Sequence, residues 1–273
     1  MKISIIIPTF SEVSQDYVKM TVESIKKYST EEHEIIVVSN PDPFYEIPID
    51  GIKRLHSPSQ GQCAAVNLGV REATNEYVLI SDDDVVFPPN WEELIEKAKE
   101  VDFLSGVFME RGQGVPCDPY VIYNPGDTPA TFRWEEFEQK AIELAEPRWE
   151  NGFGFPLLFK KSLWEEIEGY DENYDPWGSN CDSDLEYKLM LRGIMPMRWR
   201  GVVTYHFACV SGTFTRPEAQ PYWHKNTNYF SEKWGITRAR IPAIWHCDFK
   251  IDGKTLRYKP SWAKLLGNPN INL

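Results

Sequence analysis

Residues 77–84 read YVLISDDD, a short apolar run that is followed almost at once by three aspartates. The apolar run predicts a buried strand, and adjacent carboxylates at its end repel one another by roughly 1 kcal/mol per pair even in water. If the chain stays extended, Asp82 and Asp84 face one side and Asp83 the other. Two carboxylates on one side suit a hard divalent cation such as Mg²⁺ or Mn²⁺.

The same triplet also fits a simpler role, because aspartates often cap helix starts and solvated turns. Its position favours a ligand site. In open α/β sheets, ligands bind beyond the carboxyl ends of the strands, which is where this triplet is expected to lie.

The sequence on both sides of the triplet alternates between strand and helix patterns. Apolar runs predict strands at residues 3–7, 35–38, 77–80 and 103–108, and apolar residues at helical spacing predict helices at 18–25, 62–73 and 91–98. Strands that are apolar throughout fit a parallel sheet covered on both faces. We therefore expect an α/β fold with a mostly parallel, Rossmann-like central sheet flanked by helices.

The second half continues this pattern after a segment rich in Gly, Pro and Tyr at residues 110–127, which predicts a loop-like insertion. We expect strands at residues 155–159 and 197–207, and helices at 134–144, from 182 to before 193, and at 222–234. A capping box at residues 162–165 predicts another helix start.

Composition narrows the class of protein. The 273 residues are 42% hydrophobic and 26% charged, which is typical of a soluble globular chain, and the formal charge of −12 argues against a nucleic-acid-binding protein. The 37 aromatic residues (10 Trp, 13 Tyr and 14 Phe) fit either a groove that stacks rings or a core filled by large side chains.

Five cysteines without a CxxC pair predict reduced thiols and a cytoplasmic location. With no apolar run of about 20 residues, we expect a soluble or at most peripheral protein.

A second acidic group lies in residues 175–185, which read DPWGSNCDSDL. Asp182 would lie at the start of a helix, where the anion is stabilised. It is either an N-cap or a general base that deprotonates a substrate hydroxyl.

Four motifs occur along the chain in a fixed order. They are IIIPTF at residues 5–10, the segment 61–69 with Asn67 and Gly69, SDDD at 81–84, and GYDE at 169–172, which leads through Trp177-Gly178 to Asp182-Ser183-Asp184. Together they resemble the family 2 glycosyltransferases, which have the GT-A fold, over nearly the whole length.

This resemblance implies a role for each matching residue. Asp84 would ligate the metal, Asp82 would hold the metal or the ribose of the nucleotide, and Asp182 would be the base. His206 matches a third metal ligand in many relatives, although a single histidine is often structural. Trp177 would stack on a sugar or pack in the core. The residues implied on the nucleotide and sugar side are Pro8, Thr9, Asn40, Asn67, Asp82, Asp83 and Trp177.

Three positions depart from the family pattern. Cys181 stands where relatives often have Glu, Val66 where they have Arg, and Ser39-Asn40 where they have Asp. The last two leave the donor base and sugar open, and Cys181 leaves Asp182 as the expected base with Asp184 in support.

The resemblance implies a metal-dependent, inverting glycosyltransferase that uses Mn²⁺ or Mg²⁺ through a DXD motif. The expected donor is a nucleotide-diphosphate sugar, with UDP-sugars first, and the expected acceptor is a saccharide or glycolipid. Residues 1–109 would form the nucleotide-sugar-binding half, 110–215 the acceptor-binding and catalytic half, and 216–273 a C-terminal helix and tail.

Two other functions remain open at this point. A nucleotidyltransferase also uses metal-bound aspartates, but residues 8–12 (PTFSE) lack the Gly-rich, basic loop that holds a triphosphate. A carbohydrate-binding module could use the aromatic residues, but it would not need two separate acidic groups and a histidine.

Overall fold

The structure is a computed structural model of the whole chain. It describes residues 1–10, 15–39, 48–111, 121–208, 210 and 216–234, and the backbone of three C-terminal strands. Asn40, which the family resemblance implies on the nucleotide side, lies outside these residues.

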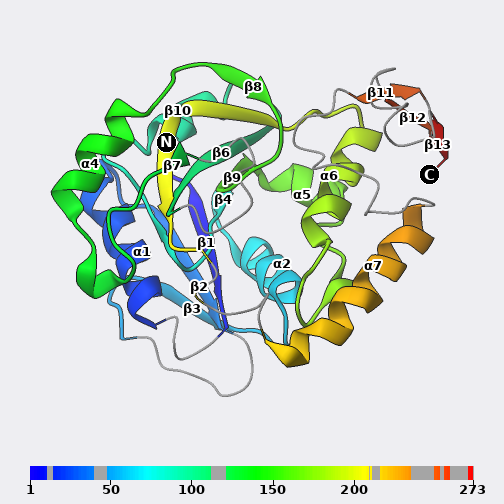
Figure 1. Cartoon of the computed structure of the whole chain (residues 1–273), viewed down its shortest axis with the longest axis horizontal. Coiled ribbons are helices and arrows are strands. Elements are labelled where there is room, and N and C mark those ends of the chain that lie inside the picture. The colour runs from blue at the N-terminus through cyan, green and yellow to red at the C-terminus, as the bar shows by residue number, and fades with distance from the viewer. Residues whose placement is uncertain are drawn as a thin grey trace.

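A mixed sheet with five parallel and four antiparallel strand pairs forms the centre of the molecule (Figure 1). Its strands are β1 (Ser4–Thr9), β2 (Glu34–Ser39), β3 (Lys53–His56), β4 (Tyr77–Ile80), β5 (Val85–Val86), β6 (Phe103–Glu110), β7 (Val121–Ile122), β8 (Trp149–Asn151), β9 (Leu157–Lys160) and β10 (Met197–His206). The strand order is β3-β2-β1-β4-β9-β6-β10-β5, with β7 beside β6 and β8 beside β10. Strands from both expected halves of the chain therefore share one sheet.

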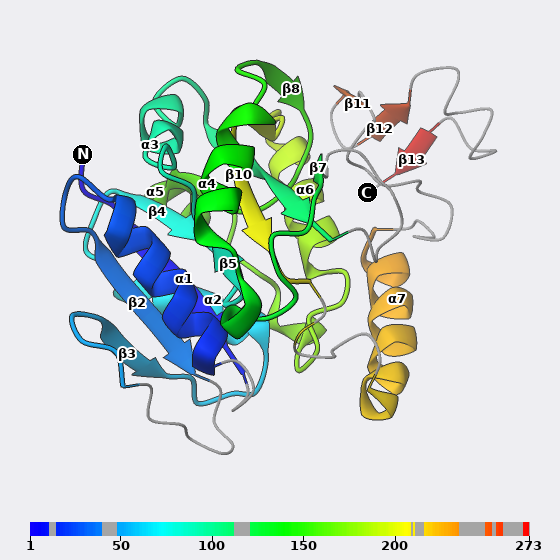
Figure 2. The same cartoon turned by 60° about the vertical axis from the view of Figure 1, so that its left-hand side comes forward.

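The helices are α1 (Gln15–Tyr28), α2 (Gln62–Glu72), α3 (Glu93–Lys97), α4 (Trp134–Glu143), α5 (Lys161–Glu166), α6 (Cys181–Leu191) and α7 (Gln220–Trp234), with short 3₁₀ turns at Pro129–Thr131, Glu172–Tyr174 and Pro217–Ala219. Helices α1 and α4 lie on one face of the sheet and α2 and α5 on the other (Figures 1 and 2). A separate sheet contains β11 (Phe249–Asp252), β12 (Thr255–Tyr258) and β13 (Asn270–Asn272). The helices in the described part of the chain are all too short or too polar to cross a lipid bilayer.

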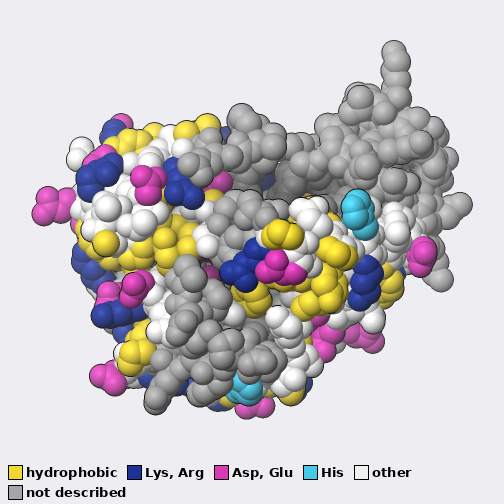
Figure 3. Space-filling model, turned by 60° about the horizontal axis from the view of Figure 1, so that its bottom comes forward, with side chains coloured by type: hydrophobic (Ala, Val, Ile, Leu, Met, Phe, Trp, Pro, Cys, Tyr) yellow, Lys and Arg dark blue, Asp and Glu magenta, His cyan; other side chains and the backbone are white. Residues whose placement is uncertain are grey.

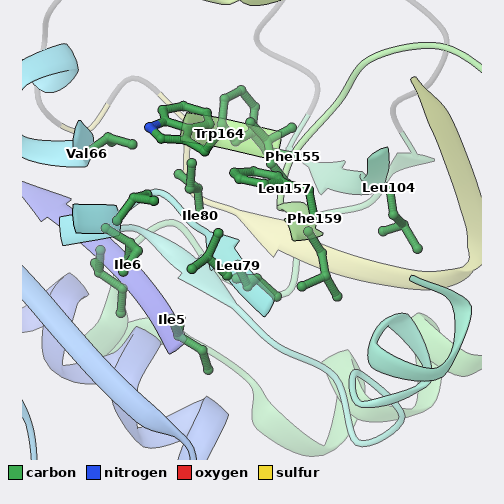
Figure 4. Close-up of a cluster of buried hydrophobic side chains, with 14 of the residues drawn as sticks. Ile5, Ile6, Val66, Leu79, Ile80, Leu104, Phe155, Leu157, Phe159 and Trp164 are labelled. Atoms are coloured by element: carbon green, nitrogen blue, oxygen red, sulfur yellow. The ribbon is translucent and has the colours of Figure 1, made fainter. Parts of the chain in front are cut away.

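The core forms because strands that are apolar on both sides are covered on both faces, as expected for a parallel sheet. Ile5 and Ile6 of β1 lie beside Leu79 and Ile80 of β4, and aromatic side chains such as Phe159 extend the cluster (Figure 4). Helix α2 packs closely on β1. A Cβ atom added at Gly69 would lie 2.4 Å from the Cγ2 of Ile6, so this position requires glycine.

The predicted fold class is confirmed, but several local predictions were wrong. Strand β9 is inserted between β4 and β6 in the antiparallel sense, which the apolar pattern alone does not reveal. Helix α5 begins at Lys161 after an N-cap at Lys160, so Ser162 lies inside it and forms no capping box. Glu110 ends β6 and does not begin a loop.

Helix α7 is joined to the rest of the molecule by buried polar contacts. The Nζ atom of Lys233 lies 2.7 Å from Asp171 Oδ2 and 2.7 Å from Asp184 Oδ1. Trp234 Nε1 donates to the same oxygen of Asp184 at 2.8 Å. The Asp184 side chain is only 1% exposed, so it anchors α7 and does not stand beside Asp182 as a supporting acid.

Replacing Lys233 by methionine should reduce the free energy of unfolding by about 3 kcal/mol, because the buried Asp184 carboxylate loses its closest counter-charge. Urea denaturation measures this difference. Lys225→Met is the matched control, because Lys225 is exposed on the same helix and should change stability by less than about 0.5 kcal/mol. Equal stability of the two variants would contradict the anchoring role.

The stability that Asp171 provides should depend on pH. Burial alone would raise the pKa of Asp171, but hydrogen bonds from Lys233, Tyr229 and the amide of Asn173 hold the pKa well below its usual value. A lowered pKa in the folded state means that the carboxylate stabilises the fold above about pH 4, and that this stability is lost as pH falls towards the folded pKa. Asp171→Asn should therefore cost most near neutral pH, and its effect should shrink below pH 4 in denaturation curves. A cost that stays constant across this range would contradict the ion-pair explanation.

Candidate functional site

The candidate site lies where β4, β6 and β10 end. After β4, the chain passes Asp82, turns at Asp83 and Asp84, and enters the short strand β5. The sequence predicted that the chain stays extended here, with Asp82 and Asp84 facing the same side. This prediction of an extended chain is wrong, because the chain turns at Asp83 and Asp84. The turn is needed because β5 pairs antiparallel with the end of β10, with Val85 opposite His206.

His206 connects two of these strand ends. Its Nε2 atom lies 3.3 Å from Asp84 Oδ1, and its Nδ1 atom lies 2.7 Å from Glu110 Oε1 at the end of β6. Burial alone would lower the pKa of His206, but these two carboxylates raise the pKa well above its usual value. Asp84 is buried, and His206 and Glu110 are mostly buried. The sequence predicted His206 as a metal ligand together with Asp84. It did not predict Glu110, although the position of Glu110 at the end of an apolar strand was a usable signal.

Asp82 shows that the acidic groups influence one another. Burial raises the pKa of Asp82 to about 7, the nearby His206 opposes this rise, and the charges of Asp84, Asp182 and Glu110 add to it. Asp182 belongs to a distant part of the sequence, so the structure brings the triplet and the second acidic group into one electrostatic neighbourhood.

The donor atoms in this neighbourhood fit a divalent cation, because carboxylates outnumber the single imidazole and their burial is costly without positive charge. In the present side-chain arrangement, no three His, Cys, Asp or Glu residues of the described chain form a ready metal site. Asp84 and Glu110 contact opposite nitrogens of His206, so they face away from a common point. A cation could be bound by Asp84, Asp82 and His206 only if it takes the place of the direct contact between His206 Nε2 and Asp84.

Asp182 is the second residue of α6 and is partly exposed. The hydroxyl of Tyr170 donates a hydrogen bond to Asp182 Oδ1 at 2.9 Å. This contact orients the carboxylate from the turn before α6. The N-cap position belongs to Asn180, which has a left-handed φ of 77°, so Asp182 stands inside the first helical turn.

Cys181 cannot replace the Glu that relatives often carry at this position. A hydrogen bond with the thiol of Cys63, together with burial and the charge of Asp182, raises the pKa of Cys181 well above its usual value. Cys63 and Cys181 are both buried free thiols. A thiol that stays protonated cannot act as a base, and this supports Asp182 as the basic group of the turn.

Asn67 has an internal role that the sequence did not predict. Its Nδ2 atom donates to the carbonyl of Tyr170 and to Glu172 Oε1, and its Oδ1 atom accepts from the amide of Tyr170 and from Trp164 Nε1. These four hydrogen bonds use the whole capacity of the side chain. They argue against the predicted nucleotide contact, which stays untested, and show that Asn67 holds α2 against the turn that carries Tyr170.

The remaining predicted residues lie in two places. Pro8 and Thr9 are buried at the end of β1, and Asp83 accepts a hydrogen bond on its carbonyl from Thr21 Oγ1 at 3.0 Å. Trp177 is partly exposed, and its ring packs edge-on against Phe10 with the centroids 5.5 Å apart. Arg216 lies over the same Phe10 ring, 5.4 Å from its centroid. Trp177 thus belongs to a surface cluster beside the end of β1, and its ring-stacking role stays a prediction.

Comparison with known proteins finds similarity to glycosyltransferases. Residues 4–138 match the model of glycosyl transferase family 2. A glucosyl-dolichyl phosphate glucuronosyltransferase of Haloferax volcanii is 24% identical over 183 residues, which cover 63% of this chain and 57% of that protein. An uncharacterised glycosyltransferase of Bacillus subtilis, YwdF, is 33% identical over 111 residues, which cover 37% of this chain and 39% of that protein. The chain thus spans about half the length of these curated relatives.

Solved structures show the same fold. TarS of S. aureus (residues 1–349) superposes with a TM-score of 0.52 at 18% identity, over 85% of this chain and 73% of that one. GalNAc-T7, solved with UDP, GalNAc and Mn²⁺, superposes with a TM-score of 0.52 at 13% identity, over 74% of this chain and 42% of that one. With the motif order and the central sheet, these matches show that residues 4–138 form a glycosyl transferase family 2 region and that the chain has the GT-A fold.

Proposed function

We propose that this chain transfers a sugar from a nucleotide-diphosphate donor to an acceptor hydroxyl with inversion of the anomeric centre, and that it requires a divalent cation. The observation that carries the proposal is the shared electrostatic neighbourhood of Asp82, Asp84, His206 and Asp182 at the ends of β4 and β10. These residues support the proposal, because carboxylates and an imidazole suit a divalent cation and the Asp182 carboxylate suits a general base.

The proposed chemistry is a single displacement. Asp182, oriented by Tyr170, takes the proton of the acceptor hydroxyl as its oxygen attacks the anomeric carbon. The new carbon–oxygen bond forms on the face opposite the donor phosphate, the old bond to that phosphate breaks, and the nucleoside diphosphate leaves. A cation bound by Asp84, His206 and Asp82 would stabilise the negative charge of the leaving diphosphate. No covalent intermediate is required, so the configuration is inverted once.

We infer the type of donor and acceptor from the names of the relatives, as part of the proposal. GalNAc-T7 was solved with UDP and Mn²⁺, which favours a UDP-sugar and Mn²⁺, with Mg²⁺ as the alternative. The Haloferax relative is named for transfer to a lipid-linked glucose, which favours a saccharide or glycolipid acceptor and peripheral contact with a membrane. Figure 3 shows acidic and basic side chains interspersed over the described part of one face, in keeping with the overall negative charge and with a partner other than nucleic acid. The cytoplasmic location expected from the cysteines stays a prediction.

A donor panel tests the function directly. The protein is incubated with UDP-, GDP-, dTDP- and CMP-sugars and Mn²⁺, and the released nucleotide is measured with and without saccharide acceptors. We expect release from one class of donor, stimulated by an acceptor, and a product whose NMR coupling constants show inversion. Release that forms a product with retained configuration would contradict the single displacement, and no release from any donor would contradict the proposed donor class.

A further inference from the structure

Glu110 holds the ring of His206 from the side opposite the proposed cation. Its Oε1 atom lies 2.7 Å from His206 Nδ1, whereas Asp84 Oδ1 lies 3.3 Å from Nε2. The exposed fractions of the three side chains are 14% for Glu110, 19% for His206 and 9% for Asp84, so water competes little with these contacts. Phe108 stacks on the imidazole with centroids 4.5 Å apart and planes 26° apart. The ring is therefore held on one face by Phe108 and on one edge by Glu110.

The backbone fixes both partners. Strands β6 and β10 are parallel neighbours, with Met109 opposite Tyr205, and Glu110 and His206 are the next residues of each strand. On its other side, His206 pairs with Val85 of β5. Because both residues lie in paired strands, the Glu110–His206 contact belongs to the end of the sheet and not to a loop.

We propose that Glu110 is a positioning residue for the cation site. This inference rests on the proposed function. Glu110 accepts the N–H of His206 Nδ1, so Nε2 points to the end of β4, where Asp84 and Asp82 lie, and a cation can bind there by displacing the proton of Nε2. Metal-binding histidines commonly donate their second N–H to a carboxylate, which fixes the tautomer and increases the basicity of the ligating nitrogen. Here the carboxylate comes from β6, the histidine from β10 and the aspartates from the turn after β4.

Glu110 could instead be a direct ligand, but the geometry argues against this role. It contacts Nδ1, and Asp84 contacts Nε2, so the imidazole ring stands between the two carboxylates. A cation at Nε2 reaches Asp84 without moving Glu110, whereas a cation at Glu110 would have to break its hydrogen bond to Nδ1. The two roles predict different effects of a glutamine at position 110, because glutamine can accept the N–H bond but is a poor ligand for a hard cation.

The test measures Mn²⁺ binding by calorimetry, with Mn²⁺ alone and with the nucleotide released in the donor panel. We compare the wild type with Glu110→Gln, Glu110→Ala and the control Glu96→Ala, which removes an exposed glutamate of α3. Glu110→Ala should weaken Mn²⁺ binding by about 10-fold to 100-fold, which is the usual effect of losing such a partner. Glu110→Gln and Glu96→Ala should stay within a few-fold of the wild type.

A spectroscopic measurement separates positioning from folding. In ¹⁵N NMR of the Mg²⁺-loaded protein, His206 should carry its proton on Nδ1 in the wild type and in Glu110→Gln, and should lose this preference in Glu110→Ala. Wild-type Mn²⁺ affinity in Glu110→Ala would overturn the proposal, and so would equal losses in Glu110→Gln and Glu110→Ala, which would make Glu110 a ligand. A wild-type protein that transfers sugar in the donor panel without binding Mn²⁺ or Mg²⁺ would overturn this inference and the metal requirement while leaving the transfer reaction in place.

Discussion

Replacing Asp182 by asparagine should lower the rate of sugar transfer by about 100-fold to 10,000-fold, which is the range that a general base contributes. The amide has the same size as the carboxylate, and its oxygen can still accept the hydrogen bond from Tyr170 Oη. It cannot take a proton from the acceptor. The expected result is therefore a folded protein with a low turnover number and a donor affinity within a few-fold of the wild type, measured by initial rates and by calorimetry.

Two controls make this result specific. Asp102→Asn makes the same chemical change at an exposed aspartate near the start of β6 and should keep wild-type turnover. Slow hydrolysis of the donor by Asp182→Asn would show that the donor side of the site is intact. Wild-type transfer by Asp182→Asn would remove the base assignment, and a loss of donor binding would show that Asp182 acts on the donor instead.

The sequence predicted the elements of the site better than their contacts. Apolar runs that end in aspartates or histidine are local signals, so β4, β10 and the start of α6 could all be located from spacing. Glu110, Tyr170 and the internal bonds of Asn67 depend on which strands and turns become neighbours. A single sequence, without known strand pairings, does not show which strands and turns become neighbours.

The acidic pair at the start of α6 illustrates the difference. Asp182 and Asp184 look equivalent in sequence, but on a helix two residues apart they point in different directions. Asp182 is partly exposed and lies in the electrostatic neighbourhood of Asp82, whereas Asp184 is buried against Lys233 and Trp234 of α7. The antiparallel insertion of β9 was likewise hidden, because a strand buried on both faces has the same apolar pattern in either direction.

Removing divalent cations should abolish sugar transfer, with a rate at least about 100-fold lower in excess EDTA, and Mn²⁺ or Mg²⁺ should restore it. The reason lies in the charge of the site. Asp82, Asp84, Asp182 and Glu110 influence one another around a single imidazole, and burial already raises the pKa of Asp82 to about 7. A diphosphate donor would bring further negative charge to this place, so the described residues alone offer it little stabilisation.

Substitution of Asp84 tests whether Mn²⁺ stimulates sugar transfer by binding at this site or through a general effect of salt. Asp84→Asn should require a much higher Mn²⁺ concentration for half-maximal transfer, because a neutral amide is a weaker ligand for a hard cation than a carboxylate. Asp102→Asn, far from the site, should keep the wild-type Mn²⁺ dependence. The measurement is the initial rate as a function of free Mn²⁺ for each protein. The contradicting result would be sugar transfer at the wild-type rate by EDTA-treated protein that is shown to be free of metal. Asp84 and His206 would then not be metal ligands, and their ion pair would serve only to hold β10 against the turn after β4.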